Sequence, residues 1–390
     1  MPGAPTDAGA PAVRVLEGLA GVAPAEWNAL VGDASPFLEW EWLATLEEAG
    51  AVGARTGWLP QHLTAWQGER LIGACPLYVK GHSLGEFVFD QGWAAAAERA
   101  GIAYYPKLLV AVPFTPVTGT RFLAAGGACA TTTALFAAAL EQVVATEQLS
   151  SAHVNFCLPE EAAALEERGW LRRTGWQYHW HNAGYATFED YLQALRSKRR
   201  NQTRRERREL AAQGVTLHTY VGDDVGPELA PLLYRLYRAT IDDNPWGRPY
   251  LNERFFALAV ERFRPRLCVI LARQDGEVVA GTVNVQKGPA LYGRYWGALR
   301  PLRHLHFNVC YYAAVEHCIA HGLARFEPGA GGEFKHMRGF EPRETTSMHF
   351  LRDGRLRAAV ADFLARERAA VQDEVEWLET RSALKRDRPG

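Results

Sequence analysis

Two stretches of the chain share one order of polar and apolar residues, and each predicts a strand that leaves a tight turn. Residues 68–81 read GERLIGACPLYVKG, and residues 275–288 read DGEVVAGTVNVQKG. Both contain a turn, a glutamate, an apolar pair, a glycine, an alternating strand and a final Lys-Gly. They lie slightly more than half the chain apart, so they indicate one module used twice. The alternative is a chance similarity between two hairpin strands.

Residues 307–323, FNVCYYAAVEHCIAHGL, predict an amphipathic helix. Apolar or aromatic residues stand at positions 307, 310, 311, 314, 315, 318 and 319, the spacing of one buried helix face. Gly322 is expected to end the helix, and LARFEP to follow as a strand. His317 and His321 are four residues apart, as in a metal-binding pair. They fall off the apolar face with no third ligand in view, so we expect two surface histidines.

A second helix is predicted from Thr187, which begins the capping pattern T-F-E-D, to a C-terminal glycine at Gly214. Its apolar residues, Leu192, Leu195 and Leu210, leave a gap that is filled by RSKRRNQTRRERR, with eight basic residues out of thirteen. This middle turn is expected to face water or an anion. One interpretation is a solvated charged helix. The other is a phosphate-binding ridge for RNA or an anionic ligand, formed by Arg199, Arg200, Arg204 and Arg205.

The alternation of strand and helix patterns predicts an α/β or α+β fold. A length of 390 residues favours two domains, which we place at residues 13–184 and 185–380, with 1–12 and 381–390 disordered. The apolar content of 48% is enough for a buried core. The sequence has no run long enough to span a bilayer and no signal pattern, and its six cysteines lack zinc-ligand spacing. These features predict reduced thiols in a cytoplasmic protein without membrane insertion.

The densest group of ionisable residues lies in the segment 326–342, FEPGAGGEFKHMRGFEP. Its glycines allow the backbone to turn with positive φ and to approach a ligand. Glu333 is a candidate general base if burial raises its pKa, and His336 a candidate proton shuttle. Lys335 and Arg338 are candidates to hold an anion or to stabilise an oxyanion. The alternative is a polar surface turn with a salt bridge.

The first half of the chain offers a second cluster. Residues 81–93, GHSLGEFVFDQGW, and residues 104–123, YYPKLLVAVPFTPVTGTRFL, supply Asp90, Tyr105 and Lys107 as candidate substrate-binding residues. Prolines in the second segment break any central strand, so part of it is expected to be exposed loop. No nucleophile elbow surrounds the serine of the first segment. The chain also lacks a Walker loop and a dinucleotide fingerprint, so we expect no tightly bound cofactor and no metal.

Four segments together resemble a family of predicted bacterial N-acyltransferases. They read HSLGEFVFDQGW, YYPKLLVAVPFTPVTGTRFL, LYGRYWGAL and CYYAAVEHCIAHGLARFEPGAGGEFKHMRGFEPRETTSMHF. These Fem-like proteins are related to the peptidoglycan-bridge aminoacyltransferases and are built from two GNAT-type folds. The resemblance covers roughly residues 27 to 352. It implies a tandem GNAT architecture and transfer of an acyl or aminoacyl group to the amine of a small molecule, peptide or cell-wall precursor.

The family's loop usually reads G-E-H-K followed by R-G-F. Here Glu333, Lys335 and Arg338 match, but Phe334 stands where a histidine is expected. This match supports the catalytic roles proposed for Glu333 and Lys335, whereas His336, the third catalytic candidate, lies two residues after the position of the family's histidine. The resemblance also implies substrate-binding roles for Arg294, Tyr295, Trp296, His306, Asn308, Tyr311, Tyr312 and Arg338. Asn308 replaces an acid of the family pattern. If that acid and the family's histidine take part in the chemistry, the protein is altered or inactive, and if they are structural, the two changes mean little.

The donor is suggested by what the sequence lacks. GNAT enzymes that use acyl-CoA bind its pyrophosphate on a Q/R-x-x-G-x-G/A loop at a helix N-terminus, and no glycine occurs from Ala298 to His321. Aminoacyl-tRNA is therefore the first candidate co-substrate and acyl-CoA the second. Arg300, Arg303 and His304 remain able to bind a phosphate with their side chains. Two other functions stay open, a non-catalytic binding protein with the tandem fold and an RNA-binding protein that uses residues 196–208.

Overall fold

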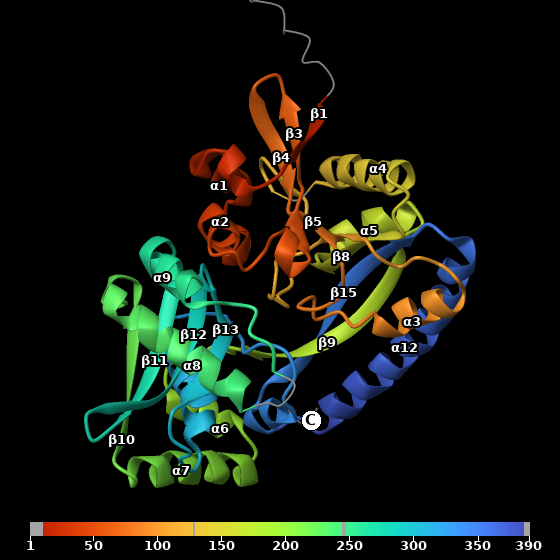
Figure 1. The fold of residues 1–390 in the computed structure, drawn as a ribbon. Helices are drawn as coiled ribbons and strands as arrows, with labels where there is room; N and C mark the ends of the chain where they lie inside the picture. The colour runs from red at the N-terminus through yellow and green to blue at the C-terminus, as the bar shows by residue number, and fades with distance from the viewer. Residues whose placement is uncertain (1–10, 128, 244–246, 386–390) are drawn as a thin grey trace, which may run out of the picture. The chain divides into compact units, whose positions relative to one another are not determined.

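A computed structural model describes residues 11–127, 129–243 and 247–385 (Figure 1). The predicted disorder of residues 1–10 and 386–390 lies outside these ranges. The chain forms two compact units. Unit 1 comprises Met1–Gly175 and Thr345–Ala369, and unit 2 comprises Trp176–Glu344 and Ala370–Gly390.

Unit 1 contains a small and a larger group of strands. The small sheet has the order β1-β3-β4-β7, from β1 (Ala12–Leu16), β3 (His62–Gln67), β4 (Arg70–Cys75) and β7 (Leu123–Ala124). The larger group has the order β2-β5-β6-β8-β15, from β2 (Trp58–Pro60), β5 (Leu77–Lys80), β6 (Lys107–Val110), β8 (Ser151–Cys157) and the unit 1 part of β15 (Glu341–Leu351). The predicted strand at 68–81 is thus two strands, because Pro76 lacks the N–H that a continuous ladder needs.

Helices cover both groups of strands in unit 1. They are α1 (Pro24–Val31), α2 (Trp40–Glu48), α3 (Gln91–Arg99), α4 (Ala130–Thr146), α5 (Pro159–Glu167) and the first part of α12 (Gly354–Thr380), with 3-10 turns η1 (Leu19–Gly21), η2 (Pro36–Leu38) and η3 (Ala54–Thr56). Phe136, Leu140 and Val144 form one buried stripe of α4. They pack with residues of β6 and β8, which pair in parallel.

Unit 2 is built on one strand order, β10-β11-β12-β13-β14-β9. The strands are β10 (Val215–Val221), β11 (Leu267–Gln274), β12 (Glu277–Lys287), β13 (Ala290–Ala298), β14 (Arg325–Glu327) and the unit 2 part of β9 (Leu171–His181). Neighbouring strands are antiparallel except β13 and β14, which are parallel. In each unit, therefore, a parallel strand pair is joined by a helical connection, α4 in unit 1 and α10–α11 in unit 2.

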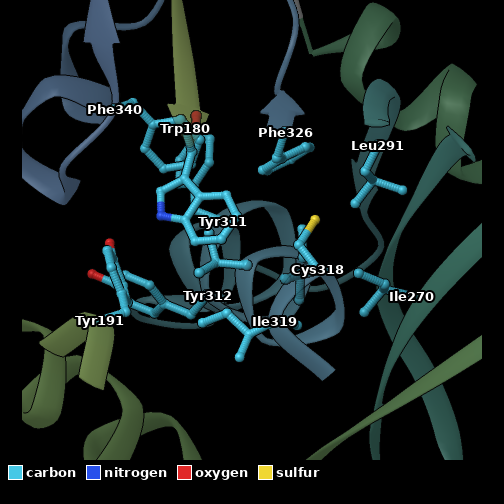
Figure 2. Packing of buried hydrophobic residues seen from close by; sticks show 14 of the residues in the cluster. Trp180, Tyr191, Ile270, Leu291, Tyr311, Tyr312, Cys318, Ile319, Phe326 and Phe340 are labelled. Carbon is cyan, nitrogen blue, oxygen red and sulfur yellow. The ribbon is translucent and has the colours of Figure 1, made fainter. Parts of the chain in front are cut away.

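The helices of unit 2 lie on both faces of these strands. They are α6 (Phe188–Ala194), α7 (Ser197–Ala211), α8 (Ala230–Asp242), α9 (Glu253–Arg262), α10 (Leu305–Phe307), the π-helical turn η7 (Asn308–Tyr312) and α11 (Ala313–Ala320), with 3-10 turns η4 (Gly222–Asp224), η5 (Pro227–Leu229), η6 (Arg264–Arg266) and η8 (Glu333–Arg338). Helix α8 packs closely on β13, since a Cβ at Gly297 would lie 1.8 Å from the Leu236 carbonyl oxygen. On the other face, Tyr311, Phe326, Phe340 and Trp180 share one core (Figure 2).

The predicted helix at 307–323 is confirmed, although it begins at Leu305 and contains a π-helical turn. Of its predicted apolar face, five of seven residues are buried and the other two are half-buried. The expectation of two surface histidines is wrong for His317. That side chain is buried, and its Nε2 lies 2.8 Å from Gln286 Oε1.

The predicted helix at 187–214 is instead two helices, α6 and α7. The Thr187 hydroxyl accepts from the Asp190 N–H at 3.1 Å, so the predicted cap is confirmed. The break falls at Leu195, which forms a β-bridge with Leu384. Ala383 is only 3% exposed. The prediction of disorder for 381–385 is therefore wrong, because this segment packs on the core of unit 2.

The compact units also differ from the predicted division at residues 184 and 185. They divide within β9, between Gly175 and Trp176, and residues 345–369 belong to unit 1. The reason is packing, since Phe350 and Leu351 pair with β8. Leu356, Val360 and Leu364 of α12 then pack with Trp93 and Tyr104. No helix in the described part of the chain is both long and apolar enough to cross a bilayer.

Candidate functional site

A cavity of about 80 Å³ lies in unit 2 where β13 and β14 stop pairing. The parallel ladder has three residue pairs and ends at Tyr292 and Glu327. The residues that follow, Gly293–Trp296 on β13 and Pro328 after β14, line the cavity. Five of the predicted substrate-binding residues also line it, namely Arg294, Tyr295, Trp296, His306 and Tyr311. The structure therefore brings these five together at one point of the sheet.

A β-bulge directs the side chains of β13 at this point. Val283 pairs with Tyr295, but the next residue of β12, Asn284, pairs with Gly293. Arg294 is thus the extra residue of the bulge, a feature that commonly re-aims a side chain beside an active site. Burial lowers the pKa of Arg294, and the charges of Tyr295 and Glu327 oppose that effect.

Aromatic rings form the wall of the cavity next to α10. The ring centroids of Trp296 and His306 are 4.9 Å apart, and those of His306 and Tyr311 are 5.3 Å apart. Burial, with smaller contributions from the charges of Arg338 and Lys335, lowers the pKa of His306 to about 4. The imidazole is therefore neutral near pH 7 and can both donate and accept a hydrogen bond.

The π-helical turn η7 separates the residues of the predicted site into two groups. Cys310 and Tyr311 line the cavity, whereas Asn308 and Tyr312 do not. The Asn308 amide donates to the carbonyl oxygens of His304 at 2.9 Å and Glu206 at 3.3 Å. A carboxylate cannot donate these bonds. The replacement of the family's acid at this position thus has a structural consequence here.

The three residues predicted to be catalytic do not line the cavity. Glu333 is exposed to solvent, so it lacks the buried surroundings that the prediction of a general base required. The Lys335 ammonium is buried and donates to the carbonyl oxygens of Gly329 and Ala330, and burial lowers its pKa to about 8. His336 Nε2 lies 3.0 Å from the carbonyl oxygen of Arg381, and burial lowers its pKa.

Arg338, the predicted anion clamp, is a buried structural contact. Its guanidinium is 2.9 Å from Glu206 Oε2, donates to the Tyr312 hydroxyl at 2.8 Å, and donates to the Phe334 carbonyl at 2.9 Å. It also lies 3.5 Å from the ring centroid of Phe307. With 2% of its surface exposed, Arg338 connects η8 to α7 and to the π-helical turn.

In unit 1, the predicted residues Asp90, Tyr105 and Lys107 meet in a buried ionic cluster. The Lys107 ammonium donates to the carboxylates of Asp90 and Glu86 and to the Ser83 hydroxyl, which also bonds Tyr105. Burial raises the pKa of Glu86 to about 7, although the charge of Lys107 acts in the opposite direction. Burial would also raise the pKa of Asp90, but the charge of Lys107 is the main influence that lowers it to about 2. These side chains bind one another, and together they fix the segment 83–90.

Sequence reasoning missed Lys80, a second buried lysine of this unit 1 cluster. Its ammonium lies 3.8 Å from Glu86 and 3.7 Å from the ring centroid of Trp58. Burial lowers its pKa to about 7. Lys80 is the last residue of the strand in the first repeated segment, two positions after the buried Tyr78. Because residues two apart in a strand point to the same face, this position was the signal that could have predicted its burial.

The basic helix α7 exposes only some of the predicted arginines. Arg204 and Arg205 are exposed, whereas Arg199 and Arg200 are half-buried, and Arg200 donates to the Leu195 carbonyl at 3.3 Å. The middle of the helix also contains the buried polar residues Thr203 and Glu206. An open hollow of about 570 Å³ is lined by Lys198, Asn201, Gln202, Arg204, Arg205 and Arg208.

Another hollow of about 680 Å³ lies between α7, β10 and α11. Asn308 is the only predicted site residue among the described residues that line it. The lining combines apolar residues with an ion pair of Arg207 and Glu316 at 2.9 Å and with the polar residues Arg208, Thr219, His317 and His321. Within the described ranges, no three His, Cys, Asp or Glu side chains are arranged to hold a metal ion.

Comparison with known structures identifies the fold. FemX is similar with a TM-score of 0.56 and 11% identity, over 87% of this chain and 98% of FemX. L-PGS from Bacillus licheniformis is similar with a TM-score of 0.53 and 10% identity, over 88% and 96% of the two chains. The C-terminal domain of a putative lysylphosphatidylglycerol synthetase from Agrobacterium fabrum is similar with a TM-score of 0.52 and 11% identity, over 88% of this chain and 95% of that domain.

These similarities confirm the predicted mixed α/β fold of the Fem type. No match was found among curated proteins. The sequence itself matches the model of the FemAB-like family, described as peptidoglycan biosynthesis/recognition, over residues 18–386. That match spans nearly the whole chain, and the protein therefore belongs to the FemAB-like family.

Proposed function

We propose that the protein is an N-acyltransferase that uses the cavity of unit 2. It transfers an acyl or aminoacyl group from an aminoacyl-tRNA or acyl-CoA donor to an amine of a small molecule, a peptide or a peptidoglycan precursor. The observation that carries the proposal is the cavity at the end of the β13–β14 ladder, bordered by the bulge at Arg294. Membership of the FemAB-like family supports the same reaction class.

The dimensions of the cavity suit a small reacting group. A volume of about 80 Å³ exceeds the roughly 10–15 Å³ that a single water molecule requires, so a group of a few heavy atoms fits. Arg294 can stabilise the negative charge that develops on the carbonyl oxygen of the donor. The amine nitrogen bonds to the carbonyl carbon, and the ester or thioester bond of the donor breaks. The departing oxygen or sulfur then takes a proton.

A polyanionic donor fits the exposed basic row of α7. Lys198, Arg205 and Arg208 surround the open hollow on this helix and can neutralise phosphates of tRNA. The entry to α10 supports the same choice. It carries no glycine, and His304 adopts φ of 64° directly before the helix. A glycine-rich pyrophosphate cradle therefore has no equivalent between β13 and α11.

The test is transfer with purified protein and two donors, bulk aminoacyl-tRNA carrying labelled amino acids and labelled acetyl-CoA. The acceptor is UDP-N-acetylmuramoyl pentapeptide with a free side-chain amine, and the product is identified by mass. Arg294→Gln should lower kcat/KM by about a hundredfold, the scale for loss of one oxyanion-stabilising donor. Arg235→Gln, which changes an exposed arginine of the same unit, should change it less than twofold. An unaltered rate in Arg294→Gln would contradict the cavity as the site.

A second candidate function is binding without catalysis. It is favoured by the positions of Glu333, Lys335 and His336, which lie outside the cavity lining. In that case the protein binds tRNA or a cell-wall precursor and forms no product with either donor. Binding of labelled tRNA, measured beside the transfer assay, distinguishes the two functions.

A further inference from the structure

Two buried polar atoms face each other at the end of β14 without a hydrogen bond. Glu327 is 5% exposed and stands between Phe326 and Pro328, which both line the cavity. Its Oε2 atom and the Nε2 atom of His179 on β9 have no hydrogen-bond partner among the described residues. The two atoms are 3.7 Å apart, beyond hydrogen-bond distance. Buried polar groups of this kind are rare in native proteins and call for a ligand or a role.

The remaining contacts of Glu327 hold its carboxylate in place. Arg325 Nε donates to Glu327 Oε1 at 2.8 Å, and Arg325 Nη2 donates to the Tyr292 hydroxyl at 2.9 Å. One carboxylate oxygen is therefore fixed, and the other is directed toward His179. Burial raises the pKa of Glu327, while Arg325 and Arg294 oppose the increase.

His179 is a neutral imidazole in these surroundings. Burial lowers its pKa to about 3. Smaller contributions in the same direction come from the charges of His181, Arg325, Arg343 and Lys335. The approach of His179 to Glu327 is consequently not an ion pair near pH 7. Two hydrogen-bond acceptors are left facing one position when His179 carries its proton on Nδ1.

We propose that Glu327 and His179 bind the acceptor amine of the transfer reaction as a primary ammonium group. This inference rests on the proposed function and names the chemistry of its acceptor. An ammonium group has three N–H donors, so it can donate to Glu327 Oε2 and to His179 Nε2 at the same time. Glu327 and its partner Tyr292 form the last pair of the β13–β14 ladder, and the cavity is lined by the residues that follow on both strands, so the bound nitrogen lies near the acyl site at the end of the ladder.

The carboxylate also completes the proton balance of the reaction. Glu327 takes one proton from the ammonium, and the neutral nitrogen then uses its lone pair to bond to the acyl carbon. The ester or thioester bond breaks, and a second proton passes from the nitrogen to the departing oxygen or sulfur. Glu327 finally releases its proton to solvent. A base with a raised pKa is suited to this exchange near neutral pH.

Calorimetric titration with Nα-acetyl-lysine amide tests amine binding without any donor. The unaltered protein should bind this probe and should not bind its Nε-acetylated form. Glu327→Gln and His179→Gln should each weaken binding at least tenfold. Glu341→Gln, which removes another carboxylate of unit 2 beside an arginine, should leave binding within twofold. Equal affinity of Glu327→Gln and the unaltered protein would overturn the inference.

The transfer assay separates this inference from the proposed function. Glu327→Gln should lower kcat by about a hundredfold or more with an unchanged KM for the donor, and its rate should lose the decline at acidic pH. If no donor supports transfer but lysine amide binding depends on Glu327, the proposed function fails and the amine site stands. If transfer proceeds equally in Glu327→Gln, the amine site fails and the proposed function stands. Thermal unfolding of each variant shows whether it remains folded.

Discussion

Replacement of Arg338 by methionine should destabilise unit 2 without a direct effect on ligand binding. The guanidinium is 2% exposed and donates to Glu206, Tyr312 and Phe334. Methionine preserves much of the side-chain length but donates no hydrogen bond. Glu206, which is also 2% exposed, then keeps its bonds from Gln202 and Tyr312 but loses its buried positive partner.

The cost follows from the charge that is left behind. Removing one member of a buried ion pair costs about 3–5 kcal/mol, because the other charge stays buried without compensation. For a domain of roughly 150–250 residues, each kcal/mol lowers Tm by about 2–4 °C, so a decrease of roughly 6–20 °C is expected. The double variant Arg338→Met/Glu206→Leu removes both charges and should recover part of this loss.

Differential scanning calorimetry of the unaltered protein and the two variants measures these changes. Binding of labelled tRNA and acyl-CoA is measured at a temperature where all three proteins are folded. The two interpretations of Arg338 then give opposite results. If Arg338 binds an anionic substrate, as the sequence predicted, Arg338→Met should melt within about 2 °C of the unaltered protein and lose ligand affinity. That result, or a double variant less stable than Arg338→Met, would refute the structural role.

Three further outcomes are expected. The pKa of Glu206 is lowered, because the hydrogen bonds from Tyr312 and Gln202 and the charge of Arg338 together outweigh the effect of burial. The ionised Glu206 therefore stabilises the folded protein above the ordinary glutamate pKa, and this contribution is lost as pH falls through the lowered value. Glu206→Gln should accordingly flatten the dependence of Tm on acidic pH. Changing Lys198, Arg205 and Arg208 to Gln should flatten the salt dependence of tRNA binding measured by fluorescence anisotropy, since each phosphate contact releases counterions; an unchanged slope would exclude this face. Glu333→Gln should leave the rate of transfer within twofold, since this carboxylate is exposed and outside the cavity lining, and a hundredfold loss would restore it as the base.

The elements that follow from local patterns were predictable from the sequence. The helix with apolar spacing at 307–319, the Thr187 cap and the strand within 275–288 all appear in the structure, and the segment 68–81 is strand on both sides of Pro76. Each depends on neighbours within a few residues, and period and capping report such neighbours. The break at Leu195 was not predictable in this way. It depends on Leu384, which lies far along the chain.

The candidate site was only partly predictable for the same reason. The motifs that resemble the family identified Arg294, Tyr295 and Trp296, and the structure places all three around one cavity. They did not reveal that Arg338 is already bound by Glu206, whose position in the chain is 132 residues away. A dense group of charges in a loop indicates many polar contacts, but the sequence does not say whether their partners belong to the protein or to a ligand.

The hydrogen bonds that an ionisable side chain makes within the protein therefore separate structural residues from candidate reactive residues. Lys107 in unit 1 and Arg338 in unit 2 each bind two or more side chains, so each is committed to holding its own loop. Glu327 has one oxygen bound by Arg325 and the other directed at His179 without a hydrogen bond. Burying that oxygen without a partner costs free energy, and a reaction that delivers an ammonium to it recovers the cost during catalysis. For this reason Glu327, which no sequence pattern singled out, is a stronger candidate for the general base than Glu333, which the sequence predicted.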